Sequence, residues 1–204
     1  MKLVDNYMPL VIVGAWNRAI FTPQWVAEFV FNKAEVQVQF PIDDFTRSSM
    51  RFSTNEIAFN IFDQRLQFNA LKQDSDTYEI IGEAALKICR MLCHTPITSF
   101  GINHVYECTE DEVKEKLAFL DLLNGEFNPN GTIKGQGLQY LIQMEDCELN
   151  LNIRKDDGVV RFDFNYNHPI NTPNTFASCF ESSNILAKKK QSEKLLENIF
   201  GLTL

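Results

Sequence analysis

The residues best suited to metal chemistry are two cysteines and a histidine in the stretch CRMLCH. Cys89 and Cys93 stand four positions apart, and His94 follows directly. On a helix this spacing puts two thiols on one face, where their thiolates could bind zinc. The chain offers no second Cys/His pair with ligand spacing nearby. Both cysteines also lie beside an apolar stripe, and free cysteine packs as a small hydrophobic residue. Core packing is therefore the prediction, with no metal and no cofactor.

Catalytic chemistry has little support in the sequence. Cys108 follows His104 by four positions, but residues four apart in a strand lie about 13 Å from each other, too far for direct pairing. No Gly-x-Ser-x-Gly elbow and no phosphate-binding Gly-x4-Gly-Lys-Ser/Thr loop occurs. The acid pairs Asp43-Asp44, Glu145-Asp146 and Asp156-Asp157 fall in expected turns, which favours solvated carboxylates over a two-metal centre. We therefore predict no catalytic residues.

Composition and charge narrow the class of protein. The chain has 204 residues, 45% of them hydrophobic, and a formal net charge of −8. Phosphate binding favours clustered Lys and Arg, so this balance argues against nucleic acid as a partner. The run Lys188–Lys190 is interpreted as a solvated helix face. No apolar run is long enough to span a bilayer, and the first residues lack a secretion-signal pattern. We expect a cytoplasmic protein with reduced thiols and no membrane partner.

Periodicity predicts the same order of elements in each half of the chain. In the first half we expect a strand, a helix, three strands and a helix at residues 8–16, 22–31, 34–40, 56–62, 65–71 and 77–94. Residues 47–54 are a further strand or an edge. In the second half the same order falls at residues 97–107, 109–123, 138–144, 148–154, 159–166 and 182–200. The segment 127–137, rich in Asn and Gly, is interpreted as a connecting loop.

Residue matches between the halves indicate an internal duplication. An offset of 87 superposes Gly14 on Gly101, and an offset of 92 superposes Glu56–Ile61 on Glu148–Ile153. Chance similarity between amphipathic strands is the alternative explanation. We predict an α+β fold in which two β-α-β-β-β-α repeats, residues 1–95 and 96–204, build one mainly antiparallel sheet. The helices are expected to pack on one face of this sheet, which leaves the other face open.

Two resemblances accompany this prediction. The element order resembles the pseudo-two-fold saddle of the TATA-binding protein and related helix-grip folds. Tyr78-Glu79, at the start of a helix, and the later stretch Gly101–Val105 resemble a sporadically distributed family of prokaryotic proteins without an assigned function. That family's strand motif, Gly-apolar-x-Tyr-x-Asn, has no clean match here for its Tyr and Asn. The second resemblance implies a mobile-element or phage-conflict context and no particular chemistry.

Polar side chains alternate with apolar ones along the predicted strands, so they share the open face of the sheet. They form an amide-rich surface suited to docking, or simply a solvated face. The expected binding residues are Asn60, Gln67, Asn69, Asn150, Asn152, Arg161, Asp163 and Asn165.

Three functions remain in view. The first is a non-enzymatic protein-binding adaptor, inhibitor or assembly component, which uses the open face or a sheet edge. A homodimer through an edge strand or the final helix belongs to this hypothesis. The second is a ligand-binding protein or enzyme with a pocket between sheet and helices, at His104 or Tyr106. The third is nucleic-acid binding on a saddle, which requires basic residues to gather on one face: Arg51, Arg65, Arg154 and Arg161.

Overall fold

Strands form where apolar and polar residues alternate, and the segments with helical periodicity become helices. The computed structural model describes residues 1–5, 7–39, 50–122, 135–170, 176–181 and 184–204. The strands are Lys2–Leu3 (β1), Leu10–Gly14 (β2), Gln37–Gln39 (β3), Met50–Ser53 (β4), Ile57–Ile61 (β5), Arg65–Ala70 (β6), Ile97–Thr109 (β7), Gly135–Gln143 (β8), Glu148–Asp156 (β9) and Val159–Pro169 (β10). The helices are Pro23–Trp25 (α1), Ser75–Met91 (α2), Glu110–Leu122 (α3), Phe176–Cys179 (α4) and Asn184–Phe200 (α5), with a short 3-10 turn at Arg18–Ile20 (η1) and a π-helical turn at Val26–Val30 (η2).

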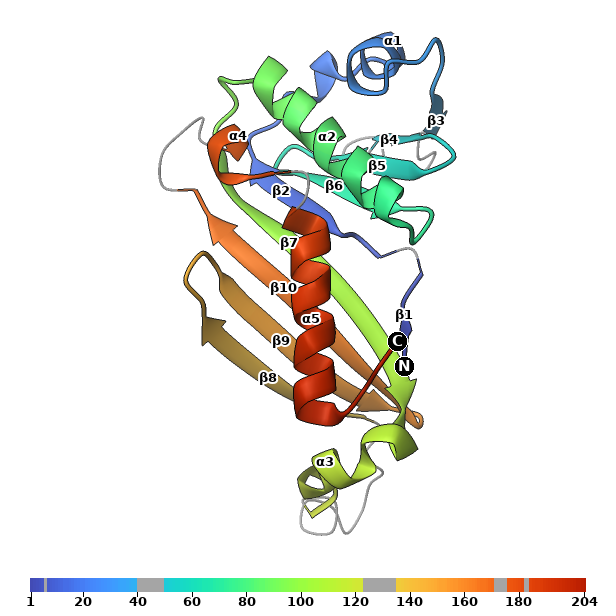
Figure 1. Ribbon diagram of the computed structural model, residues 1–204. Coiled ribbons are helices and arrows are strands. Elements are labelled where there is room, and N and C mark those ends of the chain that lie inside the picture. Colours follow the sequence, from blue (N-terminus) through green and yellow to red (C-terminus); the bar gives the residue numbers. More distant parts are fainter. Residues whose placement is uncertain (6, 40–49, 123–134, 171–175, 182–183) are drawn as a thin grey trace, which may run out of the picture.

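All ten strands join one sheet in the order β3-β4-β5-β6-β2-β7-β10-β9-β8, with β1 paired to β7 (Figure 1). Each of these pairings is antiparallel. Helices α2 and α5 lie on the same side of the sheet, α2 over the β4–β6 half and α5 over the β7–β10 half. The predicted α+β class, with helices packed on one face of an antiparallel sheet, is confirmed.

The strand order reads alike outward from the centre of the sheet. The central pair is β2 and β7, followed by β6, β5 and β4 on one side and β10, β9 and β8 on the other. An antiparallel central pair is what a two-fold axis between the halves would require. The order is therefore compatible with two repeats, and the duplication itself stays a prediction.

The core lies between the sheet and its helices and is rich in aromatic rings. Phe59 stacks between Phe52 and Phe68, with ring centroids 5.3 and 5.6 Å away. In the other half, Phe100 meets the rings of Phe176 and Phe180 edge to face. All six rings are buried, and full burial of such a side chain stabilises the fold by about 2–3 kcal/mol.

Local signals place several element ends. The Thr22 hydroxyl accepts a hydrogen bond from Trp25 N and so caps the start of α1. The β9–β10 hairpin turns at Asp157-Gly158, whose φ angles of 48° and 78° match a two-residue type I′ turn. Helix α2 begins at Ser75, two residues earlier than expected, because the Asp74 carboxylate caps it through Thr77 N. Strand β1 and helix α4 were not predicted, and Gly135–Gly137 belong to β8 although a loop was expected there.

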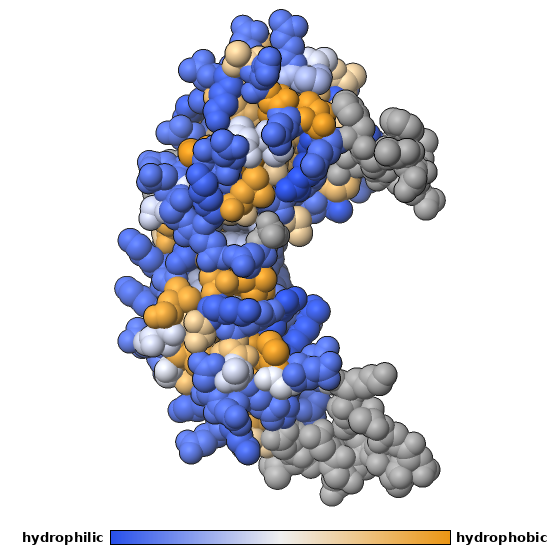
Figure 2. Space-filling view, turned by 90° about the vertical axis from the view of Figure 1, so that its right-hand side faces the viewer, coloured by the Kyte–Doolittle hydropathy of each residue, from blue (hydrophilic) through white to orange (hydrophobic). Residues whose placement is uncertain are grey.

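No described helix lies over the face of the sheet opposite α2 and α5, which is the open face. Figure 2 shows the molecule in profile, with the helix side on the left and a hollowed outline on the right, where the open face lies. None of the described helices combines the length and apolar composition needed to cross a bilayer.

Candidate functional site

The polar residues predicted to share a face do so on the open side of the sheet. In the β7–β10 half, Asn165 lies opposite Asn150 on one neighbour and Asn103 on the other. In the next row Asp163 lies opposite Asn152. The Asn165 side-chain amide donates a short hydrogen bond to Asn103 Oδ1. These contacts form a continuous amide surface, and its binding role stays a prediction.

The other half of the sheet carries a smaller amide cluster. Asn60 lies opposite Gln67, and Asn60 Nδ2 donates to Asn69 Oδ1 over 3.0 Å. Arg51 Nη1 donates to the same oxygen over 3.4 Å. Asn69 is buried by these neighbours, so its amide holds the strands together and is shielded from any partner.

Gly101 makes the close packing at the middle of the open face possible. A Cβ atom at this position would lie 3.0 Å from Asn165 Nδ2, which is tighter than an ordinary contact. Glycine therefore lets the Asn165 amide lie flat over the neighbouring strand.

The four arginines named for nucleic-acid binding all fall on the open face by register. Arg161 forms an ion pair with Glu107, and the hydrogen bond from Arg161 lowers the pKa of Glu107. Arg154 lies 3.9 Å from Asp163, whose pKa is raised chiefly by burial. Two of the arginine charges are thus offset by acids on the same face. The face is mixed in charge, and no basic groove forms among the described residues.

Among the described residues, strand β8 is the outermost strand on its side of the sheet. Its nine residues, Gly135–Gln143, include no charged residue and no proline. Tyr140, Leu141 and Ile142 expose 46%, 63% and 42% of their surfaces. Leu141 points to the open face and the other two to the helix side, beyond the cover of α5. The strand was predicted, but its edge position depends on pairings that sequence alone does not reveal.

His104 and Tyr106, proposed as pocket residues, lie in the packed interior beneath α5. His104 Nε2 lies 3.1 Å from Ile185 O, a carbonyl that can only accept, so this nitrogen carries the proton. His104 Nδ1 lies 3.1 Å from the Tyr7 hydroxyl, which also forms a hydrogen bond with the Tyr78 hydroxyl over 2.9 Å. Tyr106 Oη donates to Lys189 O. Burial lowers the pKa of His104 to about 3, so the ring is neutral. Both imidazole nitrogens serve the fold, which leaves none for substrate.

Cys89, Cys93 and His94 do not share a helix face as predicted, because α2 ends at Met91 and only Cys89 lies within it. Cys89 is buried, and burial raises the pKa of its thiol, whereas Cys93 and His94 are exposed. Cys89, Cys93, Cys108 and Cys147 are free thiols. The interpretation of Lys188–Lys190 as a solvated face is wrong for Lys188, which is buried against the β8–β9 turn. Asp43-Asp44 and most of the segment 127–137 lie outside the described residues.

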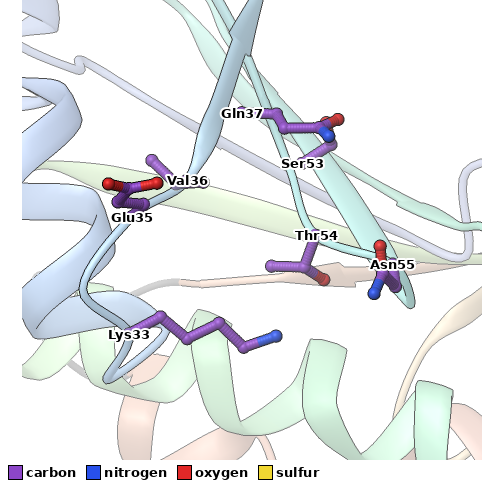
Figure 3. Close-up of a pocket in the computed structure, with 7 residues that line it drawn as sticks. All are labelled: Lys33, Glu35, Val36, Gln37, Ser53, Thr54 and Asn55. Carbon is purple, nitrogen blue, oxygen red and sulfur yellow. The ribbon is translucent and has the colours of Figure 1, made fainter.

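Surface hollows add little chemistry. The one in Figure 3 has a volume of about 240 Å³ and is lined by Lys33, Glu35, Val36, Gln37, Ser53, Thr54 and Asn55. Its side chains ring an open, polar space without a nucleophile held by a base. Thr54 Oγ1 donates to Glu56, and the bond lowers the pKa of that carboxyl. Two further hollows are lined by residues that include Met1 and Val159 in one and Val30 and Lys87 in the other. Neither His104 nor Tyr106 lines any of these three hollows.

No protein-family model matches the chain, and a search of curated proteins finds no match.

Proposed function

We propose that this chain is a non-enzymatic protein-binding component of an assembly, and that it binds through the free edge of β8. The observation that carries the proposal is the length and composition of that edge. Nine residues without charge or proline form the last strand of the sheet, and three consecutive large apolar side chains are exposed on it.

An edge of this kind is unusual for a protein that works alone. Exposed edge strands present unpaired N–H and C=O groups, and proteins protect them with charges, prolines, bulges or short length. The opposite edge, β3, is protected by its length of three residues. Strand β8 has none of these protections along its nine residues. A partner strand would satisfy its outer backbone groups and cover its apolar side chains.

The occupant that fits β8 best is β8 of a second copy. In an antiparallel pair centred on Tyr140, the two Tyr140 rings face each other and Leu138 faces Ile142 of the second copy. This row continues the apolar side of the sheet, while Gln139 faces Leu141 on the open side. Because β8 is uncharged, no like charges meet although each chain carries −8. The two sheets would become one across the dimer.

The molar mass of the purified chain tests this proposal. Light scattering or sedimentation at micromolar concentration should give about twice the chain mass of 23.5 kDa. The β8 amides should also exchange with deuterium more slowly on concentration, because pairing protects them. A species that stays at one chain mass, with freely exchanging β8 amides, contradicts the proposal.

Nucleic acid is the second candidate, because Arg51, Arg65, Arg154 and Arg161 share the open face. We expect no binding, since two of these arginines are offset by acids and the chain is acidic overall. The measurement is a mobility shift with labelled duplex DNA and with RNA at low salt. A shift that weakens steeply with added salt, and that is lost on Arg65→Gln substitution, would overturn this expectation.

A further inference from the structure

Four side chains from three separate parts of the sequence meet where the start of α5 crosses the β8–β9 turn. Asp146 and Cys147 lie in that turn, His168 near the end of β10, and Lys188 on α5. Ligand atoms of Asp146, Cys147 and His168 all lie within 4.8 Å of one another. Among the residues that the structure describes, no other set of three such side chains converges in this way.

One ring nitrogen of His168 has no hydrogen-bond partner. Its ring stacks flat on Phe100, with centroids 4.5 Å apart, and only 8% of the residue is exposed. Nε2 is buried without a hydrogen-bond partner. A buried, unpaired polar atom is costly and uncommon, and a bound ion is one way to satisfy it.

A cation already occupies the space beside these donors. The Lys188 ammonium lies 2.9 and 3.0 Å from the two carboxylate oxygens of Asp146 and 3.5 Å from Cys147 Sγ. It also lies over the ring of Tyr166, 5.1 Å from the centroid. The donors of the cluster are therefore arranged around positive charge. Lysine has a long, flexible stem, so its ammonium can leave for solvent when another cation binds.

We propose that Asp146, Cys147 and His168 bind Zn²⁺, and that Lys188 neutralises the site when the metal is absent. One thiolate, one imidazole and one carboxylate are the donor types that zinc prefers, and a sulfur ligand disfavours Mg²⁺ and Ca²⁺. Ligand atoms that lie about 2.0–2.3 Å from zinc are roughly 3.5 Å from one another. The ligand atoms of Asp146, Cys147 and His168 would therefore move about 1 Å closer together when zinc binds. On binding, Zn²⁺ replaces the thiol proton of Cys147, which goes to solvent, and a water completes the fourth position.

Co²⁺ is the probe for this site, because a thiolate bound to cobalt absorbs in the near ultraviolet. The purified, reduced chain should develop this band at one equivalent of Co²⁺ and lose it when Zn²⁺ is added. Cys147→Ser, a near-isosteric change, should abolish the band, and Asp146→Asn, on the surface, should weaken binding about tenfold. Cys93→Ser is the matched control, because this exposed thiol lies outside the cluster, and it should leave the band unchanged.

Lys188→Met gives the sharpest readout. Removing the competing ammonium should tighten Co²⁺ binding by about tenfold or more at neutral pH, whereas a purely structural lysine would give no gain. Circular dichroism checks that each variant is folded. The proposal is overturned by the absence of a band in the folded wild-type chain, by a band that survives Cys147→Ser, or by unchanged or weaker binding in Lys188→Met.

Discussion

Tyr140→Lys is expected to convert the proposed dimer to a monomer without unfolding the chain. In the register proposed for β8, Tyr140 faces its own copy across the two-fold axis, so the substitution sets two ammonium groups opposite each other. Like charges directly opposite on neighbouring strands destabilise their pairing. The side chain is 46% exposed in the single chain, so its replacement has little effect on the core. Sedimentation should show one chain mass at concentrations where the wild type shows two.

The matched control for this variant is Met91→Lys. Met91, at the end of α2, is 40% exposed. Helix α2 lies over the β4–β6 half of the sheet, whereas β8 is the last strand of the other half. Met91→Lys adds the same positive charge to the chain as Tyr140→Lys, so it controls for the change in electrostatic repulsion between two chains. Met91→Lys should stay dimeric. A Tyr140→Lys variant that dimerises as well as this control would rule out pairing through β8.

The second large effect concerns His104 and the dependence of stability on pH. In the fold the pKa of His104 is about 3, whereas an unfolded histidine has a pKa of about 6.5. Below pH 6.5 the unfolded chain therefore binds a proton that the folded chain does not. Stability is full above that pH and falls as the pH drops, by about 1.4 kcal/mol per unit. Between pH 6.5 and pH 5, His104 should remove about 2 kcal/mol from the free energy of unfolding.

Urea denaturation of wild type and His104→Asn over this pH range provides the measurement. The variant starts less stable, because the bonds to Tyr7 and Ile185 are disturbed, but its stability should fall less with pH. His168 is present in both the wild type and the variant, so its own contribution to the pH dependence of stability cancels when the two slopes are compared. His94→Asn, at an exposed position, should keep the wild-type slope. Equal slopes for wild type and His104→Asn would show that His104 takes up its proton in the folded chain.

The sheet and its faces were predictable because their signals are local. Leu149 and Leu151 alternate with Asn150 and Asn152, so the strand and the side to which each residue points follow from a period of two. The turn at Asp157-Gly158 was predictable for the same reason, since both positions require positive φ. The α+β class followed from the sum of such segments.

The features that carry the proposed functions are non-local. The free edge of β8 depends on which strands pair, and only its lack of charge was visible in the sequence. The sequence predicted a solvated turn at Asp146 and a solvated helix surface at Lys188. The fold instead brings these two side chains into contact. His104 had the character of a pocket residue, and its burial under Ile185 makes it structural. Periodicity does not report contacts between distant segments.

A charge-exchange experiment tests the pairing of β8 most directly. Tyr140→Lys and Tyr140→Glu are purified separately and then mixed in equal amounts, and the molar mass is measured by sedimentation. Each variant alone should be a monomer, because like charges meet at the two-fold axis. The mixture should form a one-to-one dimer, because lysine then faces glutamate. A mixture that stays monomeric, or variants that dimerise equally well alone, would contradict the proposed edge-to-edge pairing.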